Sequence, residues 1–232
     1  MDKVTIAFYD SDPEGYAEST IHRDVSASRG AFVSLLRPGA RVLDLGCGSG
    51  RDTVAFREEG FLVVPVDGSE GMCRAAETVI GEPVRLLSFE GLDYEDEFDG
   101  VWACASLLHL GYTELRDVLV LIRRALRDDG ILFASFKKGG YRGYRDGRWY
   151  TDLEPEAVRP IAEDAGFEVE RVWVDRDSEG RPWTNALLRK HRVRFTRSPV
   201  PRPRSPPRGH GRLCWRCPSG RTPCQRTPAM RR

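Results

Sequence analysis

Three glycines in one short segment give the strongest chemical signal in the sequence. The run Val42–Gly50 reads VLDLGCGSG and places Gly46, Gly48 and Gly50 directly after an apolar stretch. Glycine lets backbone N–H groups approach a ligand closely, and open α/β sheets bind ligands at the carboxyl ends of their strands. The run therefore predicts a ligand-binding turn between a strand and a helix. For the glycines alone, a tight turn without a ligand is the alternative.

The spacing of these glycines disfavours two common nucleotide sites. A dinucleotide-binding fingerprint counted from Gly46 would need its third glycine where Arg51 stands. A phosphate-binding P-loop would need a Gly-Lys-Ser/Thr sequence, and none follows Gly50. The turn therefore points away from nicotinamide dehydrogenases and from enzymes that hold phosphates in a P-loop.

An acidic residue follows at the distance expected for a nucleoside-binding site. Asp67 ends the next apolar run, 21 residues after Gly46, and a carboxylate there can accept hydrogen bonds from two ribose hydroxyls. Beyond it, Ser69 is a suitable helix cap and Met72 offers a soft apolar face to a flat base. The alternatives are a turn aspartate at a strand end for Asp67 and core filling for Met72.

Together these motifs resemble a known enzyme family. The runs Leu43–Gly50 and Asp67–Ser69 resemble motifs I and II of the class I S-adenosylmethionine-dependent methyltransferases, and the resemblance covers roughly residues 9–189. It implies a seven-stranded sheet with a reversed last hairpin, S-adenosylmethionine as cofactor and methyl transfer as the activity. The strings GCGSGRDT, DGS and WACASLLH are similar to a bacterial small-molecule subgroup related to tellurite-resistance methyltransferases.

The resemblance also implies a role for each matching position. Asp44 and the Gly46–Gly50 turn would hold the methionine end of the cofactor, and Asp67 would hold the ribose. Residues expected to flank the adenine or to close over the cofactor are Met72, Phe89, Glu90, Tyr9 and Tyr16. The whole implied cofactor set is Tyr9, Tyr16, Asp44, Gly46, Cys47, Gly48, Gly50, Asp67, Gly68, Ser69, Met72, Phe89, Glu90 and Ala103.

The sequence gives weaker signals for the residues that would bind the methyl acceptor. The run Ala103–His109 lacks both the D/N-P-P-Y/F tetrad of nucleic-acid amino-methyltransferases and the Pro-Cys nucleophile of cytosine C5 enzymes, which disfavours base methylation. Ser106 and His109 are the candidate catalytic residues, because the family's substrate pocket opens there. His109 has a pKa suited to a general base, and a packed structural histidine is the alternative. Methyl transfer from a sulfonium needs mainly positioning, so a dedicated base is optional.

A basic, aromatic segment follows the fifth predicted strand. Residues 137–150 read KKGGYRGYRDGRWY, and we interpret them as a flexible lid whose positive charge favours an anionic substrate. A solvated loop is the alternative. Trp183 and Asn185 begin the last predicted strand and are expected at the same mouth.

The elements that must position these residues alternate along the chain. After a helical approach over residues 9–36, apolar runs predict strands at 41–45, 61–66, 84–87, 100–104, 131–136, 167–174 and 183–188. Helical patterns fall at residues 51–59, 69–80, 115–126 and 154–165. This alternation predicts an α/β, Rossmann-like, doubly wound sheet, mostly parallel, and the two successive strands at its end predict an antiparallel hairpin.

Composition divides the chain into a domain at residues 1–190 and a tail at residues 191–232. The tail holds 12 Arg, eight Pro and no Asp, Glu or Lys, so the domain keeps 24 of the 36 basic residues against all 35 acidic ones, a net charge of −11. The tail is expected to be disordered. Two explanations stay open for it: an anion- or nucleic-acid-binding extension, or translated sequence from a reading-frame slip. Its Cys214, Cys217, Cys224 and His210 lack the paired spacing of a zinc site, so no metal is expected.

The remaining composition predicts a cytoplasmic enzyme with a small-molecule acceptor. The start of the chain has no apolar signal region, and its longest apolar runs are too short to span a bilayer. Nucleic acid would be a partner only through the basic tail. A protein or RNA acceptor tethered by that tail and a non-catalytic cofactor-binding regulator remain alternatives, and the oligomeric state is open.

Overall fold

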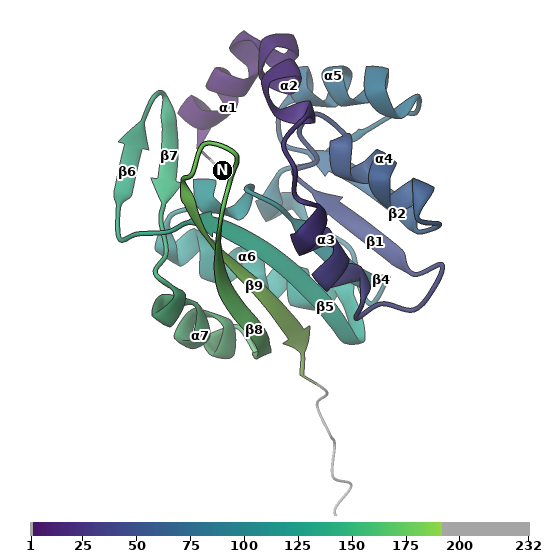
Figure 1. The fold of residues 1–232 in the computed structure, drawn as a ribbon, viewed down its shortest axis with the longest axis vertical. Coiled ribbons are helices and arrows are strands. Elements are labelled where there is room, and N and C mark those ends of the chain that lie inside the picture. The colour runs from purple at the N-terminus through teal and green to yellow at the C-terminus, as the bar shows by residue number, and fades with distance from the viewer. Residues whose placement is uncertain (1, 192–232) are drawn as a thin grey trace, which may run out of the picture. The chain divides into compact units, whose positions relative to one another are not determined.

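The computed structural model describes residues 2–191 (Figure 1). The predicted tail and its cysteines lie outside this range, apart from His191. The α-helices are α1 (Lys3–Ser11), α2 (Pro13–Ile21), α3 (Ser26–Val33), α4 (Arg51–Glu58), α5 (Glu70–Ile80), α6 (Tyr112–Ala125) and α7 (Pro155–Asp164), with short 3₁₀ turns η1 (Phe89–Gly91) and η2 (Leu107–His109). The strands are β1 (Arg41–Leu45), β2 (Leu62–Asp67), β3 (Arg85–Leu86), β4 (Phe98–Ala103), β5 (Leu126–Lys137), β6 (Arg142–Arg145), β7 (Arg148–Thr151), β8 (Phe167–Arg176) and β9 (Pro182–Lys190).

The main sheet has the predicted doubly wound topology. Its seven strands run in the order β3-β2-β1-β4-β5-β9-β8, parallel except for β9, which is antiparallel to both β5 and β8. The strand order reverses between β1 and β4, which pair in parallel from Val42↔Gly100 to Asp44↔Trp102. The prediction of a mostly parallel sheet with a reversed last hairpin is confirmed. Ligands of such sheets bind where the order reverses, at the carboxyl ends of the strands.

Helices cover both faces of this sheet because its central strands are apolar on both sides (Figure 1). Val42 of β1 packs in a cluster with Phe32 of α3 and Phe56 of α4. Its neighbours Leu43 and Leu45 belong to the larger cluster on the opposite face, which includes the buried sides of α6 and α7.

A buried aromatic group anchors β4 within the first of these clusters. Trp102 is fully buried and stacks on Phe133 of β5 with ring centroids 4.0 Å apart. Its indole Nε1 donates to Asp52 Oδ2 at 2.9 Å, so the one polar atom of the ring is satisfied. The group thus fixes the two strands whose carboxyl ends border the site.

Local signals explain where the helices near the site begin. Ser69 caps α5, as predicted, by accepting a hydrogen bond from the N–H of Met72 at 3.0 Å. Gly50 precedes α4 with a φ of +79°, a conformation that favours glycine. The helical approach is three short helices rather than one, because Pro13 begins α2 and Asp12 caps it.

The segment interpreted as a flexible lid is an ordered β-hairpin. Its strands β6 and β7 pair from Arg142↔Thr151 to Arg145↔Arg148. Asp146 and Gly147 both have positive φ, at +51° and +76°, which is the backbone of a type I′ turn. The hairpin lies beside α1 in Figure 1, and the Trp149 N–H donates to Thr5 Oγ1 at 3.0 Å.

No helix within residues 2–191 is long and apolar enough to cross a membrane. No group of three or more His, Cys, Asp or Glu side chains in this part of the chain could hold a metal ion.

We predict that Trp102→Ala lowers the free energy of unfolding by about 3–5 kcal/mol, because it removes the stack on Phe133 and leaves a cavity in the core. Urea denaturation followed by circular dichroism measures this. Val120→Ala is the control, since Val120 is 50% exposed on α6 and should change stability by less than about 0.5 kcal/mol. Equal effects of the two substitutions would contradict the packing described here.

Candidate active site

A cavity of about 340 Å³ opens where the strand order reverses, at the carboxyl ends of β1 and β4. Its lining combines the glycine turn after β1, the end of β2, the N-terminal helices and the segment after β4. Many of the predicted residues line it: Tyr9, Tyr16, Asp44, Gly46, Cys47, Gly48, Asp67, Gly68, Met72, Phe89, Ser106 and His109, with Trp183 and Asn185 as expected. The structure therefore brings together residues from distant parts of the sequence.

The glycine turn contributes space rather than free hydrogen-bond donors. The N–H groups of Gly46 and Cys47 donate to Val66 O at 2.9 and 3.0 Å, and the Gly50 N–H donates to Cys47 O at 3.0 Å. The Gly48 N–H donates to Asp67. Because these amides are already paired, the expectation that they would face a ligand is not met. A Cβ on Gly46 would lie 2.6 Å from Ser106 Cβ, so only glycine lets β1 and β4 approach this closely.

Asp67 is held by backbone donors on both of its oxygens. Oδ2 accepts from the Gly48 N–H at 3.0 Å, and Oδ1 accepts from the Ser69 N–H at 2.9 Å. Burial raises the pKa of Asp67, and these hydrogen bonds act in the opposite direction. An ionised carboxylate has about four lone-pair sites, so acceptor capacity remains on the side that faces the cavity.

A second acidic group lies beneath the turn. Asp44 is buried and accepts a hydrogen bond from Thr53 Oγ1 at 2.6 Å. Burial, reinforced by the charge of nearby Asp52, raises the pKa of Asp44 to about 7. Asp44 is therefore close to its midpoint of ionisation near neutral pH. A cation bound in this cavity would favour the ionised form.

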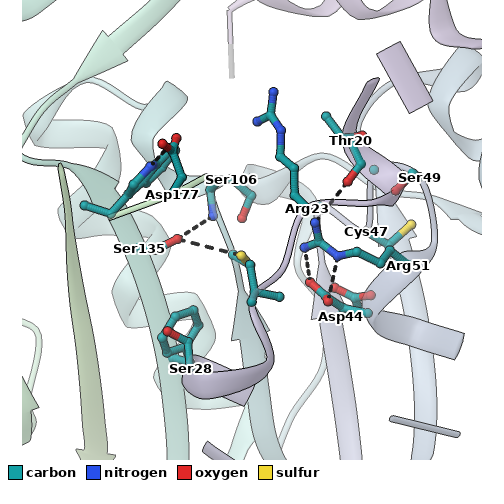
Figure 2. A pocket seen from close by; sticks show the side chains of 18 of the residues that line it. Thr20, Arg23, Ser28, Asp44, Cys47, Ser49, Arg51, Ser106, Ser135 and Asp177 are labelled. Carbon is teal, nitrogen blue, oxygen red and sulfur yellow. Dashed lines mark hydrogen bonds and ion pairs between the residues drawn. The ribbon is translucent and has the colours of Figure 1, made fainter. Parts of the chain in front are cut away.

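Arg51 links α2 to Asp52 in the first turn of α4. Its Nη1 donates to Thr20 O at 3.1 Å, and its Nη2 donates to Asp52 Oδ2 at 2.7 Å. Figure 2 shows the guanidinium between Thr20 and the carboxylates at the floor of the cavity. The residue that rules out a dinucleotide fingerprint thus fastens α2 to the start of α4.

The three cysteines within the described residues are free thiols. Burial raises the pKa of each, to about 12 for Cys73 and Cys104 and well above the ordinary value for Cys47. Since the thiolate is the nucleophile, these side chains fill space at neutral pH and do not take part in covalent chemistry.

The two predicted catalytic residues have different environments. Ser106 Oγ donates to Leu45 O at 2.7 Å, which ties the segment after β4 to the end of β1. His109 Nδ1 lies 2.7 Å from Trp149 O, and its Nε2 lies 2.7 Å from Tyr9 Oη. A carbonyl oxygen can only accept, so Nδ1 carries the proton and Nε2 accepts from the Tyr9 hydroxyl.

Burial keeps this histidine neutral. Desolvation lowers the pKa of His109 to about 4, and the positive charge of Arg148 acts in the same direction. Burial raises the pKa of Tyr9 well above 10, so its phenol is also neutral. The Nε2 atom is occupied by Tyr9, and a proton from a ligand would reach His109 only through the Tyr9 oxygen.

A second cavity of about 230 Å³ adjoins the first. It lies between the N-terminal helices, the end of β5 and the hairpin strand β7. The residues common to both linings are Tyr9, Tyr16, Arg23, Ala105, His109 and Trp183. The hydrogen-bonded pair Tyr9–His109 therefore borders both compartments.

Comparison with known proteins identifies the fold and the chemistry. Residues 43–134 match a family described as a methyltransferase domain. An uncharacterized methyltransferase of Staphylococcus carnosus is 25% identical over 183 residues, 71% of this chain and 87% of that protein. The malonyl-[acyl-carrier protein] O-methyltransferase of Salmonella typhimurium is 30% identical over 151 residues, and the match spans 63% of this chain and 59% of that enzyme.

A solved structure shares the fold. The Burkholderia thailandensis 1,6-didemethyltoxoflavin-N1-methyltransferase, with bound 1,6-didemethyltoxoflavin and S-adenosylhomocysteine, superposes with a TM-score of 0.71 at 24% identity, covering 82% of this chain and 88% of that one. The chain belongs to the class I S-adenosylmethionine-dependent methyltransferases. The cofactor of this methyltransferase is S-adenosylmethionine.

Four residues of the implied cofactor set do not line either cavity of the methyltransferase. Gly50 starts α4, and Ala103 is fully buried at the end of β4. Ser69 is also fully buried, where its hydroxyl donates to Asp10 Oδ1 at 2.6 Å. Glu90 is exposed on η1. Gly50, Ala103 and Ser69 therefore act on the site only by shaping the backbone around it.

Sequence reasoning did not single out some residues that reach the cavities from later in the chain, although it placed the segment 137–150 at the substrate mouth. Ser135 of β5 lines the larger cavity, where its Oγ accepts a hydrogen bond from the Ala105 N–H at 2.8 Å, one of the dashed lines at Ser135 in Figure 2. Arg148 and Tyr150 line the smaller one. The Asp146–Gly147 dipeptide between aromatic runs is a strong hairpin signal and would have placed these two residues on a strand.

We predict that Gly46→Ala weakens S-adenosylhomocysteine binding at least tenfold, because the new Cβ would force Ser106 and the end of β4 to move. Isothermal titration calorimetry measures the affinity. Gly39→Ala is the control: Gly39 has a similar φ of +71° with nothing within 4 Å of a Cβ, so both variants bear the same backbone strain of about 1–2 kcal/mol. Similar loss of binding in both would show that strain alone, and not the contact with Ser106, matters.

We predict that His109 makes the fold less stable in mild acid. Its folded pKa of about 4 lies below the ordinary histidine value of 6.5, so the unfolded chain takes up a proton first as the pH falls from 6.5 towards 4. This linkage removes about 2 kcal/mol of stability between pH 7.5 and pH 5. Urea denaturation at both values should show a smaller loss for His109→Gln than for wild type. His22→Gln, an exposed substitution, should lose as much as wild type.

Proposed function

We propose that this methyltransferase transfers a methyl group to a small organic molecule held in the smaller cavity, while its cofactor occupies the larger one. The observation that carries the proposal is the pair of adjoining cavities, which meet at Tyr9 and His109. The smaller cavity, of about 230 Å³, is of a size for a small molecule. The name of the Burkholderia enzyme also specifies a small-molecule acceptor.

The residues of the larger cavity fit an adenosyl sulfonium. Gly46 leaves room that a side chain would fill, and Asp67 keeps acceptor capacity for two neighbouring hydroxyls. Phe89 and Met72 supply buried apolar surface for the base. When bound, S-adenosylmethionine supplies an activated methyl group on a positively charged sulfur. Asp44 and Asp67 would stabilise that charge.

The chain's own contribution to the rate is positioning. Holding an acceptor atom in line with an electrophile is worth up to about 7–11 kcal/mol. Tyr9 is fixed by its hydrogen bond to His109, and His109 is fixed by Trp149 O. We therefore assign His109 a positioning role and propose that the Tyr9 oxygen contacts the acceptor. Ser106 would support the boundary between the cavities.

We further propose that the catalytic domain comprises residues 1–190 and works in the cytoplasm. The three cysteines within residues 2–191 are free thiols, two of them buried, which supports a reducing compartment. An acceptor on a protein or RNA would have to enter the smaller cavity between Tyr9 of α1 and Arg148 and Tyr150 of β7, which line it.

We predict that the full chain, incubated with methyl-labelled S-adenosylmethionine and a cell extract, labels low-mass metabolites. Mass spectrometry of the filtrate and scintillation counting of the macromolecular fraction measure the two classes separately. Tyr9→Phe is expected to lower kcat at least tenfold with little change in cofactor affinity, because it removes the hydroxyl and keeps the ring. Label found only in protein or RNA would overturn the small-molecule assignment.

A further inference from the structure

The two adjoining cavities differ in the sign of their charge. The larger one is lined by six carboxyl groups, those of Asp24, Asp44, Asp52, Asp67, Asp175 and Asp177, against three guanidinium groups. The lining of the smaller one contains four cations, Arg23, Lys137, Arg148 and Arg181, and no carboxyl group. An acidic compartment suits a cationic cofactor, and a purely cationic one suits a negatively charged molecule.

Three of these four cations, Arg23, Lys137 and Arg148, form no ion pair with a carboxylate of the described residues. Arg181 pairs with Asp177 at 2.8 Å and with Glu179 at 2.8 Å. By contrast, no carboxylate of the described residues lies within ion-pair distance of Lys137 or Arg148, since the nearby Asp152 pairs with Arg145 at 3.0 Å. Their charges are therefore available to a ligand.

The Tyr150 ring contacts both Lys137 and Arg148. Lys137 Nζ lies 4.2 Å from the centroid of the Tyr150 ring, and the Arg148 guanidinium carbon lies 5.5 Å from the same centroid. Arg148 also lies 4.2 Å from the Phe8 ring centroid. Cation–π contacts of this kind orient a cation but leave its hydrogen-bond donors unused. The Tyr150 ring thus links two charged donors that line the same cavity.

The electrostatics of the pair favour an anion. Burial lowers the pKa of Lys137, and the positive charges of Arg145 and Arg148 act in the same direction. The Nε atom of Arg148 is buried and has no hydrogen-bond partner in the structure. A bound anion would relieve the repulsion and supply the missing acceptor.

We propose that the methyl acceptor carries an anionic group, a carboxylate or a phosphate, bound by Lys137 and Arg148. This inference rests on the proposed function, which puts the acceptor in the smaller cavity. Arg148 offers a planar fork of donors that matches two oxygens, and Lys137 adds a point charge. The rest of the acceptor then extends from this pair towards Tyr9 and His109, at the border with the cofactor compartment.

The test uses three aromatic probes of similar shape: benzoate, phenyl phosphate and uncharged benzamide. The full chain is first saturated with S-adenosylhomocysteine, and each probe is titrated by calorimetry. Wild type should bind at least one of the two anions at least tenfold more tightly than benzamide, and the tighter anion identifies the charged group. Equal affinity for all three probes, or no measurable binding of either anion, would overturn the proposal.

Four variants locate the binding. Lys137→Met and Arg148→Met should each weaken anion binding at least tenfold without changing S-adenosylhomocysteine affinity more than twofold. Lys138→Met and Arg142→Met are the matched controls, because Lys138 pairs with Glu154 and Arg142 lies over the exposed Tyr112 ring. Anion affinity that all four variants retain, or that all four lose equally, would contradict the assignment.

Lysine acetylation of the wild-type chain gives a measurement that needs no variant. Saturating phenyl phosphate or benzoate should slow the reaction of Lys137 with acetic anhydride at least threefold and leave Lys138 unchanged, as followed by peptide mass spectrometry. Equal protection of the two lysines, or of neither, would overturn the proposal.

The two hypotheses fail separately. Methylation of an uncharged metabolite with no anion binding would remove the anion site and keep the small-molecule function. Label confined to macromolecules, together with intact anion binding, would overturn the small-molecule function and keep the anion site.

Discussion

The cofactor side of the site depends on one buried carboxylate. Asp67 accepts from the backbone of the glycine turn on one oxygen and from Ser69 at the start of α5 on the other. Ser69 in turn donates to Asp10 near the end of α1, and Asp10 also accepts from the Gly71 N–H at 2.9 Å. A buried carboxylate without such donors would be costly. The same atoms that satisfy it therefore connect β1, β2, α5 and the N-terminal helix.

The central fold could be read from the sequence because it follows local rules. Apolar runs such as Val42–Leu45 are buried on both faces, and Gly50 and Ser69 mark helix starts by their backbone and capping chemistry. The ends of elements were less predictable. β5 starts at Leu126 rather than at Ile131, because Asp129 takes a positive φ of +63° and the chain continues through the expected turn.

The site could be predicted only where one motif carries it. The glycine turn and Asp67 lie within one βαβ unit, and both were found. The acceptor side is assembled from β5, the hairpin and the N-terminal helices, so its residues come together only through tertiary packing. His109 shows the limit most clearly: its sequence position fitted either a general base or a packed structural histidine. The burial and the Tyr9 hydroxyl that bear on this choice come from tertiary packing.

The hydrogen bonds between α1 and the hairpin have a mechanical consequence. Thr5 Oγ1 accepts from the Trp149 N–H, and Asp2 Oδ1 accepts from the Tyr144 hydroxyl at 3.0 Å. At its other end, α1 is held on α5 through Asp10. A displacement of α1 therefore also pulls on the hairpin, whose strand β7 lines the smaller cavity. Motions in the walls of the two cavities are coupled through this one helix.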